Sequence, residues 1–116
     1  MIFPASAVIF DLDGVLLVSE AANLDSARAV CRPRGIEFDA EDEKRVVGRH
    51  PIDYLPELLQ RHGKPLSELE AMLAEQYEVY DQLALRVELM PGARQTTERL
   101  RTRGLRLAVA TASDER

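Results

Sequence analysis

The fold is decided by residues 7–20, AVIFDLDGVLLVSE. Four apolar residues lead directly into Asp11 and Asp13, and Gly14 then permits a tight turn. This pattern predicts a buried strand that delivers two carboxylates at its carboxyl end. Because ligands bind at that edge in open parallel α/β sheets, we expect both acids to take part in chemistry rather than in solubility.

Composition limits the possible functions. The chain has 116 residues, 46% hydrophobic and 30% charged, which suits one soluble globular unit with a small core. Its net charge of -5 argues against nucleic acid as a partner. In residues 1–19 the only charged side chains are Asp11 and Asp13, beside an apolar strand. Repulsion and desolvation would disfavour that arrangement without a cation, so the sequence predicts a bound metal.

The single cysteine, Cys31, excludes an intrachain disulfide and favours a reducing, cytoplasmic compartment. We interpret it as a buried structural thiol. The sequence has neither a basic, apolar leader nor about 18 consecutive apolar residues. We therefore expect neither secretion nor a membrane span.

Residues 20–90 show helical spacing and no strand-like alternation. Ser19 followed by Glu20 predicts a helix start, and Pro33 with Gly35 stops that helix near residue 32. A short helix should follow Asp39, with the EDEKR segment as its solvated face. The sequence thus predicts an all-helical insert of about 70 residues.

Within this insert, the composition of residues 47–51 predicts a loop. Asp53 is the expected cap of the next helix, which would place Pro56 in the tolerated first turn. His62 should lie on the packed face or at the end of that helix.

A second strand is predicted at residues 105–110, LRLAVA, after an amphipathic helix over residues 93–103. It ends in Thr111, Ala112 and Ser113. A helix just before the strand suits a right-handed crossover, which makes the two strands parallel. Asp11 and Thr111 should therefore meet at one edge of the sheet.

These residues suit phosphoryl transfer, which needs a nucleophile, a hard cation and donors around the phosphate. A carboxylate such as Asp11 can attack phosphorus and form an aspartyl-phosphate. Asp13 is close enough in sequence to protonate the leaving alkoxide and then activate water. Backbone N–H groups at the two strand ends are expected to hold the phosphoryl oxygens. The expected phosphate-binding residues are Leu12, Gly14, Thr111 and Ala112.

Two motifs and the insert between them resemble those of a known family. DLDGVLLVSE resembles the first motif, DxDGxLxDS, of the haloacid dehalogenase superfamily, and LAVATAS resembles its second. The helical insert resembles the cap of the phosphoglycolate phosphatase and β-phosphoglucomutase branch. MPGARQTTERLRTRG resembles that branch's return from cap to core. The resemblance covers nearly the whole chain.

The resemblance implies an α/β, Rossmann-like core with a parallel sheet, of which this chain holds two strands, and an all-helical cap inserted after the first strand. Residues 1–19 would form the first core strand and catalytic loop, residues 20–90 the cap, and residues 91–116 the core helix and second strand.

The resemblance also implies a Mg2+-dependent phosphatase or phosphomutase that acts on a small phosphorylated metabolite such as a sugar phosphate. Asp11 would be the nucleophile, Asp13 the acid/base and Thr111 a phosphate ligand. Mg2+ would be held by Asp11 and the main-chain carbonyl of Asp13. Dehalogenases of the superfamily lack the second aspartate. The cap residues expected to approach the substrate are Gly48, Arg49 and His50.

Two departures leave an alternative open. Val18 stands where the family usually has Asp, although Ser19 can partly replace it. The family's third motif, a Lys, and its fourth, an acidic pair that completes the metal shell, lie downstream of the second strand, beyond these 116 residues. The alternative is an inactive fragment, or a module completed by a partner chain or a C-terminal half. A phosphoacceptor receiver domain fits poorly, because such domains have no long helical insert there.

Overall fold

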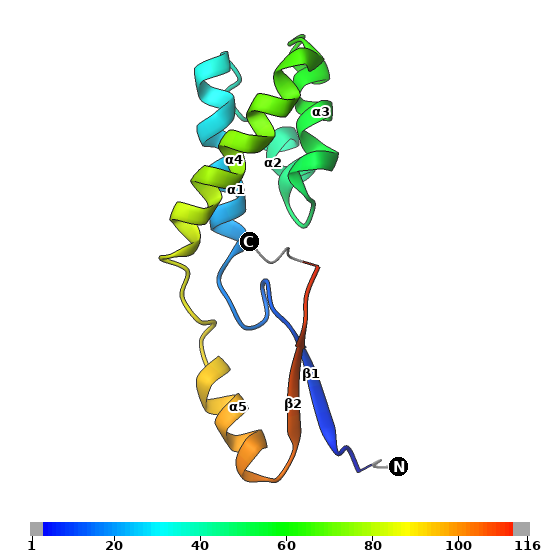
Figure 1. Ribbon diagram of the computed structural model, residues 1–116, viewed down its shortest axis with the longest axis vertical. Helices are drawn as coiled ribbons and strands as arrows, with labels where there is room; N and C mark the ends of the chain where they lie inside the picture. Colours follow the sequence, from blue (N-terminus) through cyan, green and yellow to red (C-terminus); the bar gives the residue numbers. More distant parts are fainter. Residues whose placement is uncertain (1–3, 113–116) are drawn as a thin grey trace. The chain divides into compact units, whose positions relative to one another are not determined.

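The computed structural model describes residues 4–112, which fall into two compact units (Figure 1). The helical unit spans Glu20–Val87. The strand unit comprises residues 4–19 and 88–112.

The helical unit contains no strand, as the sequence predicts for these residues. Helix α1 stops where expected, because Pro33 opens a 3-10 turn and Gly35 adopts a left-handed φ of 76°. None of the described helices is long and apolar enough to cross a membrane. The helices are α1 (Glu20–Cys31), α2 (Ala40–Val46), α3 (Pro51–Arg61) and α4 (Leu69–Ala84), with 3-10 turns at Arg32–Arg34 and Leu66–Glu68.

Helix α2 begins with a reciprocal cap. The Asp39 carboxylate accepts the Asp42 N–H at 2.9 Å, and the Asp42 carboxylate accepts the Asp39 N–H at 3.1 Å. The prediction that the EDEKR segment forms a solvated face is wrong at Asp42, which is fully buried. Its carboxylate pairs with the Arg61 guanidinium at 2.7 Å and lies within hydrogen-bond distance, 2.9 Å, of His62 Nε2. His62 thus ends α3 in a packed position, as expected.

The prediction that Asp53 caps helix α3 is wrong, because the N-cap is His50, three residues earlier. Pro51 occupies the first helical position, where its fixed φ suits the helix and its missing N–H costs nothing. The amides of Asp53 and Tyr54 donate to the His50 carbonyl. Pro56 therefore lies inside the helix rather than in its first turn.

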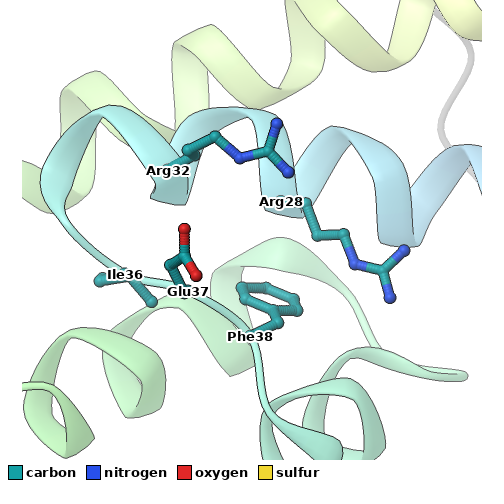
Figure 2. A pocket seen from close by; sticks show the side chains of 5 residues that line it. All are labelled: Arg28, Arg32, Ile36, Glu37 and Phe38. Atoms are coloured by element: carbon teal, nitrogen blue, oxygen red, sulfur yellow. The ribbon is translucent and has the colours of Figure 1, made fainter.

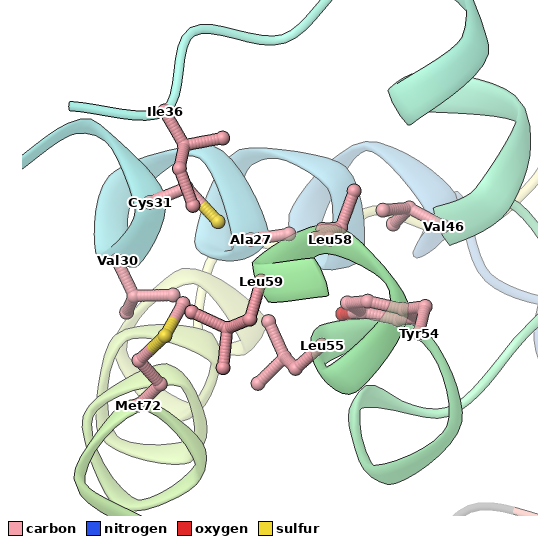
Figure 3. Packing of buried hydrophobic residues seen from close by; sticks show 10 residues of the cluster. All are labelled: Ala27, Val30, Cys31, Ile36, Val46, Tyr54, Leu55, Leu58, Leu59 and Met72. Atoms are coloured by element: carbon pink, nitrogen blue, oxygen red, sulfur yellow. The ribbon is translucent and has the colours of Figure 1, made fainter. Parts of the chain in front are cut away.

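The core of the helical unit is formed by one cluster from α1, α2, α3 and α4 (Figure 3). Leu55, Leu58 and Leu59 project from α3 toward Met72 of α4 and Ala27 of α1. Every buried hydrophobic side chain among the described residues belongs to this unit. The cluster consists of Ala27, Val30, Cys31, Ile36, Val46, Tyr54, Leu55, Leu58, Leu59 and Met72.

The strand unit holds β1 (Ala7–Asp11), α5 (Ala93–Thr102) and β2 (Arg106–Ala110). Figure 1 shows the two strands side by side, and they pair in parallel as predicted. The register runs from Ala7 opposite Arg106 to Asp11 opposite Ala110. Ser113, the last residue of the predicted strand end, lies outside the described residues.

The prediction that the first strand is buried is wrong for this structure. Ile9 is 69% exposed and Val109 is 53% exposed. Within residues 4–112 each strand has only one neighbouring strand, and α5 packs on β2. Parallel sheets normally have both faces covered, so the apolar sequence of β1 is that of a strand with more neighbours.

Candidate active site

The two strands bring the predicted site residues to one edge. Asp11 is the last residue of β1 and pairs with Ala110, the last residue of β2, so Thr111 is the first residue beyond that pair. Adjacent strands lie about 4.8 Å apart. The Asp11 carboxylate and the Thr111 hydroxyl therefore belong to residues at the ends of neighbouring strands.

A tight turn follows β1. The Leu12 carbonyl accepts the amides of Leu16 and Leu17, each at 3.0 Å. Gly14 adopts a left-handed φ of 76°, which a residue with a side chain rarely takes, and its N–H donates to the Leu17 carbonyl at 2.9 Å. The turn thus folds the chain back on itself directly after Asp13.

The returning segment is fixed by the stretch that enters α5. The Val18 N–H donates to the Glu88 carbonyl and the Met90 N–H donates to the Leu16 carbonyl, both at 2.8 Å. These bonds hold residues 16–18 against residues 88–90, within the strand unit.

The turn brings Ser19 to Asp13. The Ser19 hydroxyl donates to Asp13 Oδ1 at 2.6 Å, and Ser19 is only 3% exposed. The sequence suggested Ser19 as a helix start and missed this contact, because the six-residue separation gives no sign that the chain turns back. A hydrogen bond this short restricts the Asp13 carboxyl group to one orientation.

The predicted phosphate donors have different partners. The Leu12 N–H donates to Asp11 Oδ1 at 2.8 Å, so it already points at the predicted nucleophile. The Gly14 N–H is engaged by Leu17, and a phosphate contact from Gly14 would require that bond to be exchanged. Ala112 follows Thr111 as an exposed residue.

The oxygen atoms at this edge are of the type that binds a hard cation. Asp11 and Asp13 offer only carboxylate and carbonyl oxygens, and Mg2+ commonly binds one or two carboxylates while keeping several waters. In the described part of the chain no three His, Cys, Asp or Glu side chains gather as a metal site. Asp11 and Asp13 thus match the oxygen ligands that Mg2+ prefers.

The predicted cap residues belong to the helical unit. His50 is exposed just before α3, and the Gly48 N–H donates to Glu20 Oε1 at 3.3 Å. The Arg49 guanidinium makes two bonds of 2.8 Å to Glu57. These bonds raise the pKa of Arg49 and lower the pKa of Glu57 to about 2. The charge of Arg49 is thus largely compensated within the helical unit.

A separate hollow of about 140 Å³ lies on the helical unit (Figure 2). Arg28 and Arg32 project from one side, and Glu37 and Phe38 line the other. Arg28 is already paired with Glu43. None of the predicted site residues lines this hollow.

Fold and strand-end residues together define an α/β protein with carboxylates at the edge of a parallel sheet and a helical insertion after the first strand. A sequence model of the haloacid dehalogenase-like hydrolases matches residues 5–116. The chain belongs to this family of hydrolases, which confirms the resemblance drawn from the motifs.

The chain is also similar to individual proteins of this family. It is 27% identical over 113 residues to a phosphorylated carbohydrates phosphatase of Thermotoga maritima, covering 95% of this chain and 51% of that protein. A haloacid dehalogenase family hydrolase from Deinococcus radiodurans, solved with bound phosphate and sodium, is 29% identical, with a TM-score of 0.71 over 96% of this chain and 48% of that one.

A β-phosphoglucomutase from Clostridium difficile has a TM-score of 0.76 at 21% identity, covering 95% of this chain and 52% of that one, and so shares the fold. The chain spans 28%, 51% and 24% of the lengths of three curated relatives. The matched region thus corresponds to about half of such a protein or less.

Proposed function

We propose that this chain carries the nucleophile and the acid/base of a phosphatase that acts on a small phosphorylated metabolite through an aspartyl-phosphate. The observation that carries the proposal is the register of the sheet, which sets Asp11 beside Ala110 and Thr111. Family membership supports the same chemistry.

In the first step, an Asp11 carboxylate oxygen forms a bond to phosphorus while the bond from phosphorus to the ester oxygen breaks. Asp13 gives its proton to the leaving alkoxide, which departs as an alcohol. Thr111 holds a phosphoryl oxygen during this transfer, and the Leu12 N–H would do so only after exchanging its bond to Asp11 Oδ1.

In the second step, Asp13, now a carboxylate, takes a proton from water as the water attacks the phosphorus of the aspartyl-phosphate. The acyl phosphate bond breaks, so Asp11 is freed and inorganic phosphate leaves. The hydrogen bond from Ser19 to Asp13 Oδ1 supports this assignment, because it orients the Asp13 carboxyl group at the carboxyl end of β1.

Asp11 and the main-chain carbonyl of Asp13 are the groups we assign to Mg2+. When bound, the ion neutralises the negative charge shared by the phosphate and the two carboxylates. Its presence would also relieve the repulsion between the two acids.

A phosphorylated carbohydrate is the substrate class we favour, because the relative from Thermotoga maritima is described as a phosphorylated carbohydrates phosphatase. The cap residues Gly48, Arg49 and His50 are proposed to approach the part of the substrate that is not transferred. Arg49 would have to share its guanidinium between Glu57 and such a ligand.

The test is phosphate release from a panel of sugar phosphates with and without Mg2+. We expect Mg2+-dependent release by the natural chain and a loss of about a thousandfold or more in Asp11→Asn, because the amide is not a nucleophile. Asp25→Asn is the matched control, since Asp25 is an exposed residue of α1. Equal release by Asp11→Asn and the natural chain would refute the assignment of the nucleophile.

A further inference from the structure

The segment that carries the predicted cap residues, residues 47–50, is tied to the first turn of α1. The Gly48 N–H donates to Glu20 Oε1 at 3.3 Å. The Arg49 N–H donates to the Val46 carbonyl at 3.1 Å, which closes a turn around Gly48. Gly48 has a φ of 71°, so this turn depends on a glycine.

A second side chain of α1, Asn23, binds the Val46 carbonyl that closes this turn. Asn23 Nδ2 donates to the Val46 carbonyl at 3.3 Å, so that one oxygen accepts both the Asn23 amide and the Arg49 N–H. Glu20 and Asn23 are three residues apart and therefore lie on one face of α1. The two side chains hold the segment at two adjacent points.

The orientation of Asn23 is set from the core. The Tyr54 hydroxyl donates to Asn23 Oδ1 at 3.1 Å and accepts a hydrogen bond from Gln76 Nε2. Because the Gln76 donor occupies the hydroxyl oxygen, the Tyr54 proton is directed at Asn23. Tyr54 and Gln76 are both fully buried, and burial raises the pKa of Tyr54, which keeps this proton in place.

These bonds form a relay with a single direction: Gln76 donates to Tyr54, Tyr54 to Asn23, and Asn23 to the Val46 carbonyl. A reversed Asn23 amide would set its oxygen against the Val46 carbonyl and its NH2 against the Tyr54 proton. Both contacts would be repulsive, so the buried hydroxyl decides which way Asn23 points.

We infer that Glu20, Asn23 and Tyr54 are positioning residues that anchor the Gly48–Arg49 turn from within the helical unit. The anchor connects three helices, since Glu20 and Asn23 lie on α1, Tyr54 on α3 and Gln76 on α4. Its relevance to the substrate rests on the proposed function, which assigns this turn to the cap side of the site. The geometry of the anchor does not depend on that assignment.

Hydrogen exchange of the Gly48 and Arg49 amides in the full chain tests the inference. Tyr54→Phe removes only the hydroxyl, and we expect both amides to exchange about fivefold faster, the effect of losing roughly one net hydrogen bond. Asn23→Asp keeps the size and the oxygen but loses the donor to Val46, so it should have the same effect. Amides of α4 report any general destabilisation of the unit.

Two variants serve as controls. Ser26→Ala removes the other acceptor of Gln76, a buried hydroxyl at 3.2 Å, but leaves the hydrogen bonds of the Asn23 side chain in place. In this variant, exchange of the Gly48 and Arg49 amides should not speed up more than exchange of the α4 amides. Glu20→Gln keeps an oxygen acceptor and should retain slow exchange at Gly48, whereas Glu20→Ala should lose it.

With a phosphate ester that the protein hydrolyses, Tyr54→Phe should raise KM about fivefold and leave kcat unchanged, because only the ligand-holding turn is loosened. Unchanged exchange at Gly48 and Arg49 in both Tyr54→Phe and Asn23→Asp would overturn the anchor, whatever the activity. Failure of the Asp11→Asn test would instead remove the proposed function and leave the exchange result standing.

Discussion

At the scale of single residues, Ser19 connects the first turn of the chain to its chemistry. Its hydroxyl is buried and bonded to the carboxylate that we assign as acid/base. Val18, beside it, replaces the Asp usual in the family and is 44% exposed. Ser19 therefore provides a polar contact to the turn after β1 at this bend of the chain.

Ser19→Ala should lower the free energy of unfolding by about 2 kcal/mol, because it removes a buried hydrogen bond to a charged group. The measurement is urea denaturation followed by circular dichroism, because the chain has no tryptophan for fluorescence. Ser67→Ala, at an exposed position in a 3-10 turn, is the control and should change the value by less than about 0.5 kcal/mol. An equal response of the two variants would mean that the Ser19 hydroxyl does not stabilise the turn.

Cys31 should be unreactive in the folded protein. Its side chain is fully buried, and desolvation raises the pKa of the thiol to about 12, so the reactive thiolate is scarce near neutral pH. A thiol-specific chromogenic reagent at pH 8 should label Cys31 only after unfolding. Rapid labelling under native conditions would show that α1 opens readily at this position.

At the scale of elements, Glu57 ties α3 to the segment that follows α2. Arg49 binds its carboxylate through two nitrogens and Arg45 binds it at 3.4 Å. The Arg49 contact is the main cause that lowers the pKa of Glu57 from 4.5 to about 2. A lowered pKa means that the ionised carboxylate favours the folded state, so this contribution is complete above about pH 4.5 and is lost as the pH falls toward 2.

Glu57→Gln should therefore lower Tm at neutral pH and make Tm fall less steeply than in the natural chain between pH 4.5 and 2. Thermal unfolding at a series of pH values measures both effects. Glu70→Gln is the matched control, because Glu70 is an exposed residue of α4 and forms no ion pair with the described residues. Identical acid limbs for Glu57→Gln and the natural chain would contradict the role of the ion pair.

The sequence predicted most elements because their ends carry local signals. Pro33 and Gly35 stop α1, and Asp39 caps α2, since these residues act on their own backbone. The start of α3 was placed wrongly because Pro51 and Asp53 are both good starting residues. The burial of Asp42 was missed because its partners, Arg61 and His62, come from a different helix.

At the scale of the whole molecule, the two units differ in how they are stabilised. All buried hydrophobic side chains of the described chain lie in the helical unit, whereas the strands and α5 have none. The apolar sequence of β1 predicted burial because sequence alone does not show how many neighbours a strand has. The arrival of Asp11 and Thr111 at one edge of the sheet was predictable, since it needs only parallel strands, whereas the register that pairs Asp11 with Ala110 was not.

The helical unit should fold without the strands. A fragment of residues 20–87 should unfold cooperatively on heating, because it retains the complete core cluster. Leu58→Ala in that fragment should cost about 2–5 kcal/mol, as expected for a fully buried leucine. A broad, non-cooperative transition of the unmodified fragment would show that the helices need the strand unit to pack.

The most direct test of the central claim is to identify the phosphorylated residue. Asp13→Asn removes the group that activates water, so incubation with a reactive phosphate ester and Mg2+ should trap the intermediate. We predict that mass spectrometry finds one phosphoryl group on the peptide that contains Asp11, and none when Asp11 is also changed to Asn. A phosphoryl group on another residue, or phosphate release by the natural chain with no label at Asp11, would contradict the account.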